Sequence, residues 1–218
     1  MPDFRALRER MVAQQIAGRG LVGESLLDAF REVPRELFVA PDLAGEAYED
    51  RPLPIEAGQT ISQPYIVAFM IDAARVRPGQ RVLEVGAGSG YAAAILGRIA
   101  DAVVAIERHP ELARIARERM ERLGYRNVRV VEGDGTLGFP EEAPYDAILA
   151  AAAGREVPEA LLDQLAYDGI LVMPVGAPSG AQRLVRVRRR GERFEREELD
   201  AVRFVPLIGA QGWPEDRP

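Results

Sequence analysis

Apolar and polar positions near the start of the chain follow the spacing of an α-helix. Apolar residues from Phe4 to Ile16 recur every three or four positions, which predicts an amphipathic helix over residues 3–18. A shorter helix is predicted over 24–33, and a proline opens a third helix over 64–75. We expect the first two helices to form a cap that packs on the main domain.

The middle of the chain alternates between short apolar runs and helical periodicity. The runs predict strands at 81–85, 102–106, 128–131, 145–150 and 169–175, and the periodic stretches predict helices near 90–99, 110–123 and 158–166. Alternating β and α units predict a parallel sheet with helices on both faces. Segments 182–189 and 194–205 alternate polar and apolar residues around a turn, which predicts an antiparallel pair. We therefore expect a doubly wound α/β fold with a mostly parallel seven-stranded sheet.

The length of 218 residues suits one α/β domain. We expect residues 1–75 to hold the helical cap and a substrate loop, 76–180 a cofactor-binding core, and 181–218 the C-terminal strands and a tail. Residues 41–64 carry four prolines and little periodicity, so we interpret them as a mobile loop that covers an active site. We expect residues 211–218 to be partly mobile.

Composition excludes several kinds of chemistry. The chain has no cysteine and a single histidine, His109, so thiolate catalysis and zinc or iron–sulfur sites are not expected. A net charge of -6 argues against nucleic acid as a partner. No apolar stretch could span a membrane and no signal peptide is evident, which predicts a cytoplasmic protein. All 28 basic residues are Arg and one Asn is present, which fits either a thermophilic source or a GC-rich genome.

A glycine-rich turn joins the first strand of the core to its helix. Gly86, Gly88 and Gly90 stand between the strand at 81–85 and the following helix, where the backbone must turn sharply and a ligand can approach closely. The spacing is G-x-G-x-G, whereas a dinucleotide site prefers G-x-G-x-x-G. Glu84 precedes the turn, and its carboxylate would attract an ammonium group and repel a diphosphate.

Two further loops carry acidic residues at the ends of neighbouring strands. Glu107 ends the second strand and could accept hydrogen bonds from both hydroxyls of a ribose. Asp134, between Gly133 and Gly135, follows the third strand and could accept a hydrogen bond from an adenine amino group. The carboxyl ends of parallel strands share one edge of a sheet, so these loops would form one crevice. The combination resembles the Rossmann-like, S-adenosylmethionine-dependent methyltransferases.

Segments outside that crevice narrow the resemblance to the protein-L-isoaspartate O-methyltransferase family. Similar to that family are residues 11–16 (Met-Val-Ala-Gln-Gln-Ile), 47–55 (Ala-Tyr-Glu-Asp-Arg-Pro-Leu-Pro-Ile), 58–64 (Gly-Gln-Thr-Ile-Ser-Gln-Pro), 144–148, 157–161 and 203–209. The resemblance extends from about residue 8 to residue 213. Ala151 and Arg155 depart from the family pattern, which usually has a threonine and a proline there.

The resemblance implies a function and a set of site residues. The methyl donor would be S-adenosylmethionine, the product S-adenosylhomocysteine, and the acceptor the free carboxylate of L-isoaspartyl residues in damaged proteins, which are then repaired through a succinimide. Ser62 would orient the acceptor carboxylate, Thr60 and Ile61 would contact the donor, and Ile55, Tyr65 and Val205 would contact the substrate. We further expect a monomer, and no metal site is expected from a chain without cysteine and with a single histidine.

Three alternatives stay open from the residues alone. The enzyme could methylate another carboxylate or a small metabolite, which the loop at 41–64 disfavours. The chain could instead bind the cofactor or damaged peptides without turnover, although Ser62, Glu84, Glu107 and Asp134 favour catalysis. A nicotinamide-dependent dehydrogenase is the third reading, and the glycine spacing disfavours it.

Overall fold

A computed structural model describes residues 2–215 of the chain. Its main feature is one sheet in the order β5-β4-β3-β6-β7-β8-β9, beside a separate two-stranded ribbon of β1 and β2. The strands are β1 Leu53–Pro54, β2 Thr60–Ile61, β3 Arg81–Val85, β4 Ala102–Glu107, β5 Val128–Glu132, β6 Tyr145–Ala150, β7 Leu165–Gly176, β8 Gln182–Arg190 and β9 Arg193–Val202. Neighbouring strands from β5 to β7 pair in parallel, whereas β8 and β9 pair antiparallel. The predicted seven-stranded doubly wound sheet is therefore confirmed.

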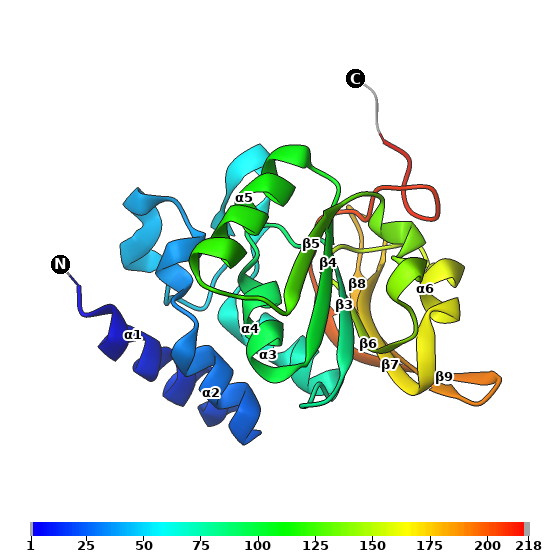
Figure 1. Cartoon of the computed structure of the whole chain (residues 1–218), viewed down its shortest axis with the longest axis horizontal. Coiled ribbons are helices and arrows are strands. Elements are labelled where there is room, and N and C mark those ends of the chain that lie inside the picture. Colours follow the sequence, from blue (N-terminus) through cyan, green and yellow to red (C-terminus); the bar gives the residue numbers. More distant parts are fainter. Residues whose placement is uncertain (1, 216–218) are drawn as a thin grey trace.

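Residues 2–215 form six α-helices, four of which lie directly on the two sides of the sheet (Figure 1). They are α1 Phe4–Met11, α2 Glu24–Glu32, α3 Pro64–Ala73, α4 Tyr91–Ile99, α5 Pro110–Arg122 and α6 Glu159–Asp163. Helices α3, α4 and α5 lie on one side of the sheet and α6 on the other, while α1 and α2 lie outside α3 and α4. The predicted N-terminal helical cap is thus present.

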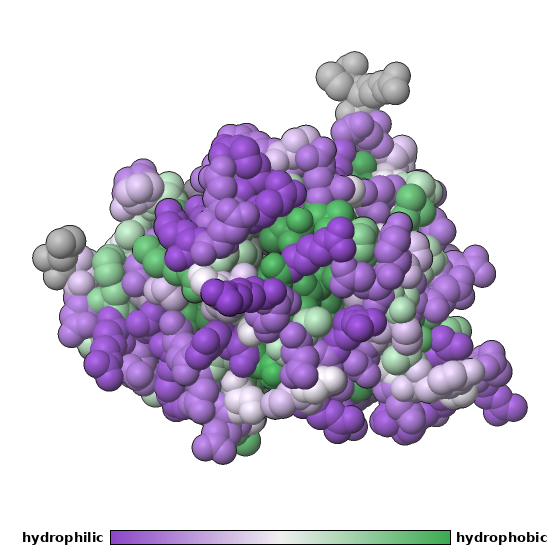
Figure 2. All heavy atoms as spheres, in the orientation of Figure 1, coloured by the Kyte–Doolittle hydropathy of each residue, from purple (hydrophilic) through white to green (hydrophobic). Residues whose placement is uncertain are grey.

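The two faces of the sheet bury different side chains, as the period of two along a strand requires. Val82 and Val103 belong to the larger core, which includes the buried residues of α1 to α5. Leu83 and Val104, their neighbours in sequence, belong to a second core that includes Leu161 of α6. Because both faces are covered by helices, the central strands are apolar on both sides and read as continuous hydrophobic runs. Figure 2 shows a mostly hydrophilic surface with one hydrophobic area over β4 and β5, towards the β5 edge of the sheet.

Two predicted boundaries were wrong, and the first helix is less regular than expected. The first helix changes to a π-helix over Val12–Ile16 and to a 3₁₀ turn over Ala17–Arg19. The predicted helix 158–166 is shorter, because Leu165 already pairs with Tyr145 in the sheet. Strand β9 ends at Val202, before the predicted residue 205. There the side chain of Gln182 bonds to both the N–H and the C=O of Phe204, and the chain leaves the sheet.

The segment 41–64 is also more structured than expected. It contains 3₁₀ turns at Pro41–Glu46 and Glu56–Gly58 and the antiparallel ribbon in which Leu53 pairs with Ile61. Ala47, Tyr48, Leu53 and Ile61 from this segment are buried. The prolines break helical periodicity without making the segment irregular, because short 3₁₀ turns and two-residue strands leave no periodic pattern. The segment is therefore more ordered in its backbone than an irregular loop, and its expected mobility stays a prediction.

Candidate functional site

A cavity of about 330 Å³ lies at the edge of the sheet where the strand order reverses, beside β3, β4 and β6. In open α/β sheets, ligands bind in the crevice outside the carboxyl ends of the strands at such a point. Nine of the residues predicted for the site line it: Thr60, Ile61, Ser62, Glu84, Gly86, Gly88, Glu107, Gly135 and Val205. The structure thus brings together the glycine turn, the end of β4 and the ribbon, which are separated in sequence.

Glu107 is fixed by the backbone around it. Its Oε2 accepts a hydrogen bond of 2.8 Å from the N–H of Gly88, and its Oε1 accepts one of 2.9 Å from the N–H of His109. The residue is only 5% exposed and lines the cavity. Each carboxylate oxygen has two lone pairs, so acceptor capacity remains for a ligand. The predicted position for holding a pair of hydroxyls is therefore occupied by a carboxylate in one defined orientation.

Glu84 is a buried acid with an unpaired oxygen. The residue is 2% exposed, and its Oε2 makes no hydrogen bond in the structure. Burial raises its pKa well above the ordinary value, and the neighbouring charge of Glu107 raises it further. A buried polar atom without a partner costs about 1–3 kcal/mol, and a cationic ligand in the cavity would remove that cost. Glu84 is thus the residue in the cavity wall that an ammonium group would suit best.

The three glycines of the turn have two different roles. Gly86 and Gly88 line the cavity, and both have a positive φ, as the turn from β3 into α4 requires. Gly90 does not line the cavity. A Cβ on Gly90 would lie 3.2 Å from Cε of Met120 and 3.3 Å from Cβ of Ala116 on α5. The structure therefore gives Gly90 a packing role between α4 and α5, and its expected contact with the cofactor stays a prediction.

Four other predicted site residues lie outside the cavity lining. Ile55 comes near it, because its Cδ1 would be 3.5 Å from a Cβ on Gly88. Tyr65 stacks on Phe69 with ring centroids 5.8 Å apart. The guanidinium of Arg19 lies 3.2 Å from the ring centroid of Tyr65. Gly133 donates its N–H to the carbonyl of Glu107 over 3.0 Å. These contacts support the walls of the cavity without reaching into it.

The fourth residue, Asp134, caps the turn that follows β5. Its Oδ1 accepts from the N–H and the hydroxyl of Thr136, at 2.9 and 2.6 Å, and its Oδ2 accepts from the N–H of Ala210 at 2.7 Å. The carboxylate is therefore engaged by the protein itself. Oδ2 still has acceptor capacity, so the expected contact with an adenine amino group stays a prediction.

A segment after β9 forms a wall of the cavity that sequence reasoning largely missed. Residues 204–208 line it, and only Val205 was predicted. The segment is held by Ala153, whose N–H donates to Val205 and whose C=O accepts from Leu207, each at 2.8 Å. Trp213 adds a bond of 2.9 Å from its indole N–H to the same carbonyl. Residues 211–215 are thus anchored, contrary to the mobile tail expected, and residues 216–218 lie outside the described range.

The helices beside the cavity supply apolar lining that was assigned to the core. Val67, Met70 and Ile71 of α3 and Leu96 of α4 face the cavity. Their helical spacing predicts burial, and nothing in the sequence distinguishes an apolar side chain that faces a cavity from one that faces a neighbour. Arg108 and His109 also line it, and the only signal for them was their position after Glu107.

The two departures from the family pattern have different surroundings. Ala151 lines the cavity beside Gly86, and its N–H continues the sheet by donating to Val85 over 2.8 Å. Arg155 lies outside the lining, and its guanidinium is 4.6 Å from the ring centroid of Trp213. Alanine at 151 makes this part of the wall apolar, whereas Arg155 helps to hold the segment that closes it.

Over residues 2–215, no group of three or more His, Cys, Asp or Glu is arranged to hold a metal ion. No helix in that range combines the length and the apolar character needed to cross a membrane.

Comparison with known proteins identifies relatives along nearly the whole chain. Protein-L-isoaspartate O-methyltransferase 2 of Pelobacter propionicus is 58% identical over 207 residues, which cover 94% of this chain and 92% of that protein. The protein-L-isoaspartate O-methyltransferase of Methanoculleus marisnigri is 53% identical over 209 residues, covering 96% and 94%.

Solved structures and a family model agree with these relatives. A protein-L-isoaspartate O-methyltransferase structure superposes with a TM-score of 0.86 at 32% identity, covering 94% of this chain and 67% of that one. A putative enzyme of the same name from Plasmodium falciparum, in complex with S-adenosyl-L-homocysteine, has the same fold, with a TM-score of 0.80 at 24% identity and coverage of 95% and 99%. The family model described as protein-L-isoaspartate(D-aspartate) O-methyltransferase matches residues 6–212. The chain therefore belongs to the protein-L-isoaspartate(D-aspartate) O-methyltransferase family.

Proposed function

We propose that the cavity beside β3, β4 and β6 is where this protein joins its two substrates, with Ser62 orienting the acceptor. As a member of its family, the protein transfers a methyl group from S-adenosylmethionine to the free carboxylate of L-isoaspartyl residues, which initiates repair of damaged proteins. The observation that carries the residue assignments is the convergence of Ser62, Glu84 and Glu107 on one cavity.

The cavity fits S-adenosylmethionine by the chemistry of its donor and acceptor groups. Glu84 has a buried oxygen without a partner, which suits the ammonium of the methionine part. Glu107 presents an oriented carboxylate, which suits the ribose hydroxyls. The glycine turn at Gly86 and Gly88 leaves the backbone accessible between them. When bound, the cofactor supplies an electrophilic methyl group on a sulfonium.

The residues of the chain then act by position and by exclusion of water. A carboxylate is ionised at neutral pH, so its oxygen can attack without a general base. We assign the Ser62 hydroxyl to donate a hydrogen bond to one carboxylate oxygen so that the other faces the methyl group. Holding two reactants in line can contribute about 7–11 kcal/mol to lowering the barrier. The apolar lining from α3 and the segment 204–208 keeps water away from the reacting oxygen.

Further features of the protein follow from this proposal and from its composition. Its substrate is an exposed, flexible peptide segment, because the isoaspartyl carboxylate must enter the cavity. We also propose that the chain is one domain that acts as a cytoplasmic monomer without nucleic acid as a partner. The net charge of -6 supports the last point. Its composition, with Arg as the sole basic residue apart from His109, suits a thermophilic source or a GC-rich genome equally.

One experiment tests both the reaction and the role of Ser62. Transfer of labelled methyl from S-adenosylmethionine is measured on two peptides that differ only in L-isoaspartate or L-aspartate at one position. We expect transfer to the isoaspartyl peptide, and in Ser62→Ala a fall in kcat with nearly unchanged affinity for S-adenosylhomocysteine. Ser25→Ala, on the exposed side of α2, is the matched control. Normal turnover with weaker cofactor binding would move Ser62 to the donor side of the site.

A further inference from the structure

Arg119 contacts both of the segments that carry the proposed donor and acceptor residues. It lies near the end of α5 and is 8% exposed. Its Nη1 donates a hydrogen bond of 3.0 Å to the carbonyl of Ser89, in the glycine turn. Its Nη2 lies 3.8 Å from Oε1 of Glu56, at the tip of the ribbon. One guanidinium thus links the wall that contacts the donor to the ribbon that leads to Ser62.

The two ends of this link are well placed to transmit a displacement. Ser89 lines the cavity between Gly88 and Gly90. Glu56 begins the turn between β1 and β2. The two ends of this turn are joined by a hydrogen bond of 2.9 Å from the N–H of Ile55 to the carbonyl of Gln59. A shift at Glu56 therefore moves β2, which is followed directly by Ser62. The planar fork of an arginine holds both contacts in one fixed geometry, whereas an ammonium is a compact charge on a flexible stem.

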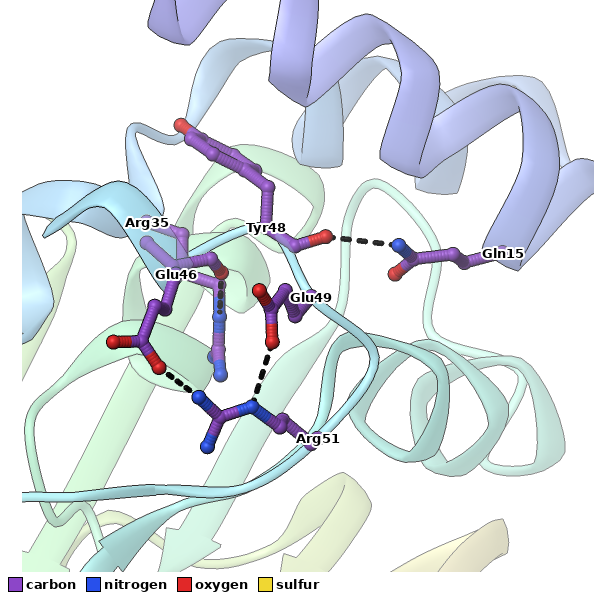
Figure 3. Close-up of polar contacts among 7 residues, drawn as sticks. Gln15, Arg35, Glu46, Tyr48, Glu49 and Arg51 are labelled. Carbon is purple, nitrogen blue, oxygen red and sulfur yellow. Dashed lines mark hydrogen bonds and ion pairs between the residues drawn. The ribbon is translucent and has the colours of Figure 1, made fainter. Parts of the chain in front are cut away.

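The part of the segment that precedes the ribbon is fixed by other residues (Figure 3). Gln15 donates to the carbonyl of Tyr48 over 2.8 Å, and the buried Arg35 donates to the carbonyl of Ala47 over 2.6 Å. Arg51 pairs with Glu46 and with Glu49. Residues 46–51 are therefore held by contacts that do not involve Arg119. At the other end of the ribbon, in the turn between β1 and β2, Arg119 contacts Glu56.

We propose that Arg119 is a positioning residue that couples the binding of the donor to the binding of the acceptor. A donor bound at the glycine turn restricts the position of Ser89. Because the Arg119 guanidinium contacts both Ser89 and Glu56, the position of Glu56, and with it the ribbon, is restricted as well. By reciprocity, a bound peptide tightens binding of the donor by the same factor. This role rests on the proposed assignment of the cavity and of Ser62, and it adds a residue that does not itself line the cavity.

The test compares the affinity for S-adenosylhomocysteine with and without a saturating isoaspartyl peptide. In the unmodified protein we expect the peptide to tighten binding about two- to fivefold, the range that a partly exposed ion pair can contribute. In Glu56→Gln the ratio should fall to about one, while affinity for S-adenosylhomocysteine alone stays unchanged, because Ser89 keeps its partner. The same variant should raise KM for the peptide by a similar factor and change kcat less. A ratio of about one in the unmodified protein, or an undiminished ratio in Glu56→Gln, would overturn the proposal.

Substitutions of Arg119 itself test the same coupling. Arg119→Met removes both contacts and should lower the ratio and the affinity for S-adenosylhomocysteine together, whereas Arg119→Lys should recover at most one of these effects. Arg114→Met is the control, because Arg114 is on the same helix, is exposed and pairs with Glu118. If Arg119→Met does not fold, Glu56→Gln still decides, since its side chain is 35% exposed. Absence of methyl transfer by the unmodified protein would instead refute the proposed function.

Discussion

Replacing Gly90 with alanine tests whether this glycine serves the fold or the cofactor. Its φ of 86° is in the left-handed region, which costs an alanine about 1–2 kcal/mol. The added Cβ would also lie 3.3 Å from the Cβ of Ala116, whose backbone position on α5 leaves little room to yield. Such overpacking costs about 1–3 kcal/mol more.

Gly124→Ala is the matched control for this substitution. Gly124 has a φ of 78°, and a Cβ there would meet no atom within 4 Å. Both variants lose the same freedom in the unfolded chain, which offsets about 0.4–1 kcal/mol in each case. The difference between them therefore isolates packing of α4 on α5. We expect the free energy of unfolding to fall by about 1–3 kcal/mol more in Gly90→Ala.

Urea unfolding of the two variants, combined with calorimetric titration of S-adenosylhomocysteine, provides the measurement. A packing role predicts the larger loss of stability in Gly90→Ala, with the affinity of the folded protein close to that of the control. Equal destabilisation of both variants would refute the packing argument. If affinity were also lost selectively in Gly90→Ala, the glycine would contact the cofactor after all.

Three further predictions concern the cavity. Glu107→Ala should weaken binding of S-adenosylhomocysteine by about 1–3 kcal/mol, and unchanged affinity in a folded variant would remove Glu107 from the proposed ribose site. Because burial raises the pKa of Glu84, the donor-free folded state keeps a proton that the unfolded chain loses. Its free energy of unfolding should therefore fall as pH rises from the ordinary glutamate range through the raised pKa. Urea unfolding across pH should show that slope reduced in Glu84→Gln, and an identical slope would contradict the assignment. Amide hydrogen exchange over residues 55–63 should slow when S-adenosylhomocysteine and an isoaspartyl peptide are both bound, while 81–85 is protected without them. Equal exchange in free and bound protein would indicate a preformed pocket.

The sequence predicts best what depends on local pattern and on the geometry of parallel sheets. The run from β3 into Gly86 and the acid at the end of β4 were sufficient to place Glu107 at the cavity, because strand ends share one edge. Short apolar runs for the parallel strands, and alternation of polar and apolar residues for β8 and β9, were sufficient to find every strand of the large sheet. The ribbon residues Thr60, Ile61 and Ser62 were found through resemblance to a family, and their residue types alone would not have distinguished them from an ordinary loop.

The features that could not be predicted depend on partners far along the chain. Asp134 carries the right charge at the right strand end, yet its carboxylate is taken by the N–H of Ala210, 76 residues later. Gln182 ends β9 early through bonds to Phe204, 22 residues away. The change from α-helix to π-helix at Val12 leaves the apolar spacing nearly unaltered, so periodicity does not reveal it. For Asp134 and Gln182, contacts with residues distant in the sequence decide between options that local pattern leaves open.

The wall formed by residues 204–208 has a consequence for synthesis of the protein. A ribosome makes the glycine turn and the ribbon more than a hundred residues before this wall emerges. Ala153 can hold the segment only after Val205 and Leu207 have left the exit tunnel. A nascent chain whose earlier strands have already paired therefore still lacks an enclosed donor site. Enclosure of the cavity therefore depends on a segment that is made late, so it is completed only after residues 204–208 have folded back onto Ala153.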